Sequence, residues 1–245
     1  MKKITLTLIS LACCGIAAAA PDTKAVNFGS TSVDVGWTTH TQAGGASISV
    51  TSPYQLTVSA NGGNFNTGNY GTGSTTTLHA DILAEFLRTT GISMTANVYQ
   101  TGLTNGAAGV QTTSFSGLVA NESYTMYVVY GCQNRANDQY FTLDTNYITK
   151  AEQYVTSSAS GAYSTLDLAA SSKTHTLRGS ADYVVLKLTG HADALGNLTI
   201  GRMGERGTIN ALTLTQTSSI IPEPSIAAFG LFGFAGLALR RRRAA

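Results

Sequence analysis

The sequence predicts an all-β fold with one short helix, and three observations favour it. The body of the chain is rich in Thr, Ser, Gly and Asn and poor in charge. Runs of β-branched and aromatic residues alternate with turn-forming residues, as is typical of short strands. Between residues 22 and 219 the chain has one proline, Pro53. We therefore expect a single β-sandwich domain over residues 21–219, a length at which sandwiches fold as one unit.

The first third of this domain predicts short strands and a long loop. The expected strands are 25–29, 33–38, 48–51 and 54–60. In the last of these, Tyr54, Leu56 and Val58 recur at every second position, which places them on one face of a strand. The Asn/Gly/Thr-rich stretch 60–77 is expected to form a loop between strands.

One segment, residues 78–88, has helical periodicity. Its apolar residues fall on one side and its charged residues on the other, with Gly91 as a stop signal. The apolar set is Leu78, Ile82, Leu83 and Phe86, and the charged set is Asp81, Glu85 and Arg88. We expect a short helix on the end of a sheet, with its acidic residues pointing outward.

The remainder of the domain predicts strands throughout. They are 93–100, 110–115, 123–130, 141–143, 162–168, 175–178, 183–188, 197–200 and 209–215. Segment 123–130 has the strongest pattern, because both of its alternating sets are largely apolar. Such a strand is expected at the centre of a sheet, buried on both faces.

The start of the chain predicts export. Lys2 and Lys3 precede an apolar run, 4–19, that ends in small residues, which is the pattern of a secretory signal peptide over residues 1–20. The Sec machinery is the implied partner, with cleavage after Ala19 or Ala20. An alternative stays open, because Leu11-Ala12-Cys13-Cys14 approximates a lipoprotein signal in which Cys14 would carry lipid.

The end of the chain, 220–245, combines three elements. These are Pro222-Glu223-Pro224, the uncharged apolar run 226–239, and the cluster Arg240, Arg241, Arg242 and Arg243. An apolar helix that stops at an arginine block predicts a transmembrane segment with its arginine end on the cytoplasmic side. The two prolines keep the triplet extended and accessible to a protease. A plain anchor without processing is the alternative.

The order of these three elements resembles the PEP-CTERM sorting signal of bacterial surface and exopolysaccharide-associated proteins. The resemblance implies an exosortase-type membrane protease as partner, cutting near Pro222-Glu223-Pro224. It implies a protein anchored in the inner membrane before processing and located at the cell surface or outside the cell afterwards.

Segment 116–215 carries a second resemblance. The runs Ser116-Gly-Leu-Val-Ala-Asn-Glu-Ser-Tyr-Thr-Met-Tyr-Val-Val-Tyr-Gly131 and Ala181-Asp-Tyr-Val-Val-Leu-Lys-Leu-Thr-Gly190, then Ala192–Ile200 and Gly207–Leu214, follow in order. Val26-Asn27-Phe28-Gly29 with Trp37 completes the pattern. This succession is similar to galactose-binding-like jelly rolls found in bacterial surface proteins, which implies a jelly-roll β-sandwich.

Charge and motifs exclude several function classes. The whole chain carries +2, but the domain is near −3 once Lys2, Lys3, Arg240–Arg243 and Glu223 are set aside. Without clustered Lys and Arg we expect no nucleic-acid partner. No metal or cofactor is expected, because no Cys/His group has zinc spacing. A plain turn is expected at His191-Ala-Asp193 with Asn197, and a calcium site there is the alternative. We expect no enzyme, because no nucleophile elbow occurs and no carboxylate pair can be identified.

Glycan association is the expected activity. Sugars stack on exposed aromatic rings, and Trp37 and Tyr70 are the candidates, with Asn134, Arg135 and Asp138 to donate and accept hydrogen bonds. Two alternatives remain at this point. One is a structural surface or matrix protein without a ligand, and the other is a carbohydrate-active hydrolase.

Overall fold

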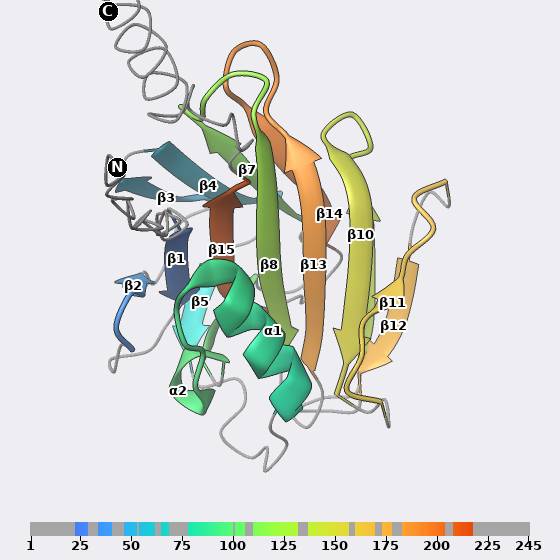
Figure 1. Ribbon diagram of the computed structural model, residues 1–245. Coiled ribbons are helices and arrows are strands. Elements are labelled where there is room, and N and C mark those ends of the chain that lie inside the picture. Colours follow the sequence, from blue (N-terminus) through green and yellow to red (C-terminus); the bar gives the residue numbers. More distant parts are fainter. Residues whose placement is uncertain are drawn as a thin grey trace, which may run out of the picture.

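Two sheets pack face to face in the computed structural model and form a β-sandwich (Figure 1). The structure describes residues 23–28, 34–40, 47–52, 54–61, 65–68, 78–99, 101–105, 110–131, 137–156, 160–169, 173–177, 183–203 and 208–217. Over these ranges the prediction of an all-β sandwich with a helix is confirmed.

The first sheet, sheet A, has the strand order β11-β10-β13-β8-β15-β1-β2 in the described part of the chain, with β6 on β15 and β5 on β6. Its strands are β1 (Thr23–Phe28), β2 (Thr38–His40), β5 (Phe65–Gly68), β6 (Gly102–Asn105), β8 (Ser123–Gly131), β10 (Ile148–Val155), β11 (Ser164–Thr165), β13 (Tyr183–His191) and β15 (Thr208–Gln216). Apart from the parallel pair β1–β2, neighbouring strands run antiparallel.

The second sheet, sheet B, has the order β12-β9-β14-β7-β4-β3 among the described strands and is antiparallel. Its strands are β3 (Ser47–Ser52), β4 (Tyr54–Asn61), β7 (Val110–Ser116), β9 (Asn137–Leu143), β12 (Lys173–Leu177) and β14 (Leu198–Met203). The core between the sheets includes Leu56, Phe115 and Ile200 from sheet B and Val128 and Leu186 from sheet A.

Strand β8 lies between β13 and β15, at the centre of sheet A. Met126 and Val128 are buried in the core between the sheets, whereas Tyr127 and Val129 are buried in a second apolar cluster on the opposite face. The prediction of a central strand buried on both faces is therefore confirmed.

Helix α1 (Ala80–Thr90) covers this opposite face of sheet A (Figure 1). His79 caps its start by accepting a hydrogen bond from Asp81 N, and Gly91 ends it with φ +74° in the left-handed region. The helix and its stop are confirmed. The expectation of packing on the end of a sheet was wrong, because Ile82 and Phe86 are buried with Tyr127 on the sheet's face.

Several segments differ from the sequence expectation. Strand β5 lies within 60–77, where a loop was expected, and β6 and β10 form where no strand was expected. Residues 93–100 were expected to form a strand, but the helix α2 (Ala96–Tyr99) lies there. Its carbonyls are held by buried amides, since Asn27 Nδ2 donates to Val98 O at 3.0 Å and Asn210 Nδ2 to Tyr99 O at 2.9 Å. In 33–38, residues 34–37 form a turn and β2 starts only at Thr38.

Both predicted targeting segments, 1–20 and 220–245, lie outside the described residues. The part of the chain that the structure describes contains no helix with the length and apolar character to cross a membrane. The predicted helix 226–239 is not in that part.

Candidate functional site

The outward face of sheet B carries hydroxyl groups on five of its strands, β3, β4, β7, β9 and β14. In β4 and β7, the buried residues alternate with partly exposed Ser and Thr, so that one side of each strand enters the core and the other meets solvent. We call this outward side the hydroxyl face. Its described members are Ser49, Thr57, Ser59, Thr112, Ser114, Thr142 and Thr199, with Arg202 as its cation.

The strand register aligns these residues in two rows that cross the sheet. One row runs Ser49, Thr57, Ser114, Thr199, and the other runs Ser59, Thr112, Arg202, Thr142. Paired residues on one face lie within about 5 Å of each other. The rows therefore present closely spaced hydroxyls, each able to donate and to accept a hydrogen bond.

An open depression of about 410 Å³ lies at the β9–β14–β7 side of this face. Its lining residues are Thr112, Thr142, Leu143, Asp144, Thr145, Thr199, Gly201 and Arg202. The lining thus combines hydroxyls, one apolar side chain, one carboxylate and one guanidinium. It contains no aromatic residue.

A bulge in β14 shapes the floor of the depression. The register with β7 shifts between Thr199 and Gly201. Gly201 has φ +140°, and a Cβ atom there would lie 2.1 Å from the carbonyl oxygen of Thr142 on β9. Only glycine lets the two strands approach so closely at this backbone conformation.

The carboxylate of Asp144 is held by a turn at the rim. Asp144 N donates to Ile200 O at 2.9 Å, and the carbonyl of Asp144 accepts from Tyr147 N at 3.0 Å and Ile148 N at 2.8 Å. Its Oδ1 accepts from Asn146 N at 3.0 Å. The backbone of Asp144 is thus anchored on β14. Arg202 is exposed and forms no ion pair with another described residue.

Trp37, the first predicted sugar-stacking residue, is buried. It is 7% exposed, stacks on Phe86 with ring centroids 6.0 Å apart, and donates from Nε1 to Ser93 O at 2.7 Å. This placement corrects the sequence-based hypothesis, because both the ring and its polar atom are used by the core. Tyr99 and Tyr154 are buried as well.

For the other predicted site residues the described structure gives no test. Tyr70, Asn134 and Arg135 lie outside the described residues. Asp138 lies in β9, where its backbone pairs with Thr176, and its side chain is outside the described part. Sequence reasoning missed the depression. The sequence carries little signal for it, because the buried positions of 111–116 include Gln111 and Thr113 and so do not contrast with the hydroxyl-bearing residues beside them.

The Asp193 loop, considered for calcium, is closed by its own hydrogen bonds. One carboxylate oxygen accepts from Leu195 N and Asn197 N, both at 2.8 Å, and the other accepts from Asn197 Nδ2 at 3.3 Å and Tyr147 Oη at 3.5 Å. The hydrogen bond from the backbone N–H of Asn197 is the main reason that the pKa of the Asp193 carboxyl lies below its usual value. Among the described residues no three His, Cys, Asp or Glu side chains gather as metal ligands.

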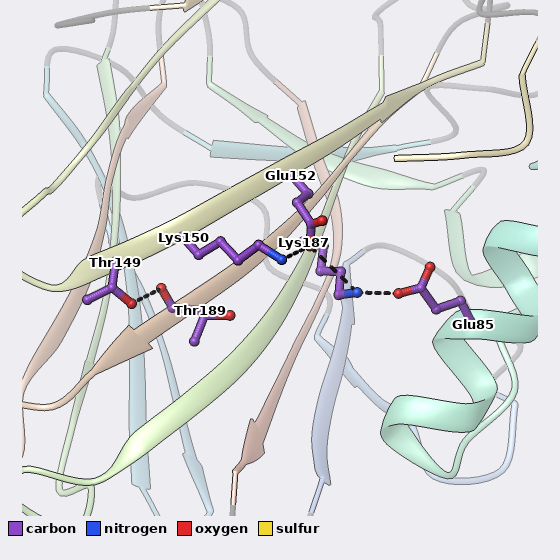
Figure 2. A network of polar contacts seen from close by, with 6 residues as sticks. All are labelled: Glu85, Thr149, Lys150, Glu152, Lys187 and Thr189. Carbon is purple, nitrogen blue, oxygen red and sulfur yellow. Dashed lines mark hydrogen bonds and ion pairs between the residues drawn. The ribbon is translucent and has the colours of Figure 1, made fainter. Parts of the chain in front are cut away.

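A charge network joins α1 to sheet A (Figure 2). Lys187 on β13 contacts Glu85 of α1, and its Nζ lies 3.7 Å from Glu152, which in turn pairs with Lys150 at 3.1 Å. Burial lowers the pKa of Lys187, but the hydrogen bond to Glu85 and the electrostatic effects of Tyr127, Glu85 and Glu152 together outweigh burial, so the net shift is upward. Glu85 was expected to point into solvent, and this contact corrects that expectation. The network fastens the helix.

Comparisons with known proteins give no family. No family model matches the chain, and no curated protein matches it. Among solved structures, TmCBM61 in complex with β-1,4-galactotriose is 10% identical over 67% of this chain and 89% of its own, with a TM-score of 0.22. The enzymatically active domain of bacteriophage CBA120 tailspike protein 4 is 9% identical over 65% of this chain and 19% of its own, with a TM-score of 0.20. TM-scores this low carry no argument about the fold, which rests on the arrangement of the two sheets.

Proposed function

We propose that this chain is an exported bacterial surface or matrix protein whose sandwich binds a neutral polysaccharide on the hydroxyl face of sheet B. The observation that carries the proposal is the open depression, where Asp144 and Arg202 accompany four threonines. A guanidinium only donates hydrogen bonds and a carboxylate only accepts them, while sugar hydroxyls do both. Because one negative and one positive side chain line the depression, it favours a ligand that carries no net charge.

The geometry of the face supports an extended ligand. The two rows of side chains cross the sheet away from the depression, so a chain of sugars bound at Arg202 meets further hydroxyls on β7 and β4. No described element covers this face, whereas α1 covers the outer face of sheet A. The absence of aromatic lining predicts weak binding that depends on hydrogen bonds.

A glycan array probed with the detergent-solubilised full chain tests this proposal. We expect binding to at least one neutral polysaccharide. Arg202→Ala should weaken that binding about tenfold or more, because a hydrogen bond to a charged group contributes about 1.5–3 kcal/mol. Arg88→Ala is the matched control, since Arg88 is exposed on α1 and belongs to the other layer.

Two results would count against the proposal. One is a folded wild-type chain that binds no glycan above background. The other is an Arg202→Ala chain that binds as tightly as the wild type. Turnover of a bound glycan would favour the hydrolase alternative, and concentration-dependent self-association without glycan binding would favour a matrix protein.

The proposal includes the two chain ends. It takes 1–20 as a signal peptide and 220–245 as a PEP-CTERM-type signal cut near Pro222-Glu223-Pro224 by an exosortase-type protease. It also takes the sandwich as a jelly roll. The strand order supports this, because the chain passes back and forth between the sheets: β7, β9, β12 and β14 lie in sheet B, and β8, β10, β13 and β15 lie in sheet A.

Intact mass of the protein from its native host tests the ends. We expect a chain that lacks both the leader and the residues after the triplet. A Pro222→Ala/Pro224→Ala variant should retain the tail and stay with the membrane fraction. A full-length, soluble wild-type chain in the cytosol would contradict export and sorting together. A lipid mass on Cys14 would replace simple secretion with lipoprotein export.

A further inference from the structure

Both ends of the domain leave the sandwich at the same side. Thr23, the first described residue, pairs with Thr215 near the end of β15, and their side-chain oxygens lie 2.9 Å apart. Thr217, the last described residue, donates from its backbone N–H to Ser123 O at 2.9 Å. The two targeting segments therefore extend from the end of sheet A where β8 begins.

Two loops are joined at this same end. They are residues 117–122 between β7 and β8 and residues 192–197 between β13 and β14 (Figure 1). Leu118 N donates to Gly196 O at 3.0 Å, Asn121 N to Asp193 O at 3.2 Å, and Ala192 N to Glu122 O at 3.0 Å. These bonds place residues 119–120 opposite residues 194–195.

The residues between these bonds are apolar and exposed. Val119 is 55% exposed and Leu195 is 82% exposed, and Ala120 and Ala194 are exposed beside them. We call these four residues the apolar tip. Neither loop contains Lys or Arg. Of the nearby acids, Asp193 directs its carboxylate into its own loop, and Glu122 lies at the base of the other. The tip is thus an exposed apolar patch on two loops that backbone hydrogen bonds hold together.

The chain itself indicates what covers the tip. Only residues 218–225 separate Thr217 from the apolar run that starts at Ile226. Fully extended, this connection spans at most about 30 Å. If the run is inserted, the bilayer surface lies within that distance of this end of the domain. Exposed Val and Leu on loops that are hydrogen-bonded to each other suit the boundary between head groups and acyl chains.

We propose that the apolar tip inserts shallowly into the lipid surface while the tail is in the membrane, so that the sandwich stands with this end toward the bilayer. The inference rests on the proposed sorting tail. It gives the tip an orienting role, since it would hold the domain in one position above the triplet that the protease has to reach. The absence of basic residues predicts contact through apolar side chains, with little dependence on anionic lipid.

Tryptophan quenching in vesicles tests this contact. The chain has one tryptophan, Trp37, which is buried and supplies a constant background. The full chain carrying Leu195→Trp would be reconstituted into phosphatidylethanolamine–phosphatidylglycerol vesicles, with and without lipids brominated near the head-group end of the acyl chains. Ala80→Trp is the control, because Ala80 is exposed and lies away from the tip. It starts α1 next to His79, and His79 contacts Gly161, which follows the end of β10 farthest from the tip.

We expect Leu195→Trp emission to shift to the blue and to lose intensity with brominated lipid, and Ala80→Trp emission to be the same with and without brominated lipid. Flotation of the vesicles tests membrane insertion of the sorting tail separately from lipid contact by the apolar tip. A chain that does not float contradicts both the sorting tail and the inference. If the chain floats but Leu195→Trp is quenched no more than Ala80→Trp, the inference alone is overturned. A blue shift of Leu195→Trp without quenching also overturns it, because protein and not lipid would then cover the tip.

Discussion

At the scale of single residues, the candidate site depends on side chains that sequence patterns rank low. Threonine is common in this chain, so the residues that line the depression, such as Thr142 and Thr199, stand out only after strand register aligns them. Trp37 was predicted to stack on a sugar because it is an aromatic residue beside an expected loop. Its burial against Phe86 follows from the apolar area that it removes from water.

Asp193 supplies a pH test at this scale. Because the pKa of Asp193 is lowered in the folded state from its ordinary value of 3.8, its stabilising effect is present above that value and is lost as the pH falls through the folded pKa. Asp193→Asn should therefore lower the melting temperature at neutral pH. The gap to the wild type should close in acid. A gap of constant size from neutral pH into acid would contradict the role assigned to this carboxylate.

At the scale of elements, sequence patterns succeeded where one physical rule dominated. Strand β8 has two apolar sets, and α1 has a clear apolar side and a glycine stop, so both were predictable. Strand β10 was missed because its Lys150 and Glu152 mask the pattern, and only the ion pairs of Glu152 with Lys150 and with Lys187 on β13 explain these charges. Segment 93–100 looked like a strand, but buried Asn27 and Asn210 stabilise α2 from distant positions.

Helix α1 is expected to be an integral part of the core. Phe86 is 0% exposed, stacks on Trp37 and meets the edge of Tyr127 at 5.1 Å between centroids. Phe86→Ala should lower the free energy of unfolding by about 3–5 kcal/mol, as large-to-small core changes do. Urea titration followed by Trp37 fluorescence measures this change. The control is Leu87→Ala, because Leu87 is 49% exposed and should cost no more than about 0.5 kcal/mol. Equal losses for the two variants would contradict the packing.

At the scale of the whole molecule, the two layers have different roles. In sheet A, α1 covers the outer face, and the first described strand, β1, pairs with the last, β15. Sheet B leaves a polar face to solvent. The sequence predicted the sandwich because alternation is a local property. It did not predict which sheet would carry the site, because the rows from Ser49 to Thr199 are assembled from strands distant in the chain.

The central claim, that polysaccharide binds on the hydroxyl face, is tested most directly by threonine methyl NMR of the full chain during titration with a glycan that it binds. The account predicts saturable shifts of the methyl signals of Thr112, Thr142, Thr145 and Thr199, which line the depression, with no change at Thr213, which is buried in sheet A. Saturable shifts confined to residues outside sheet B, with the four lining threonines unmoved, would contradict it.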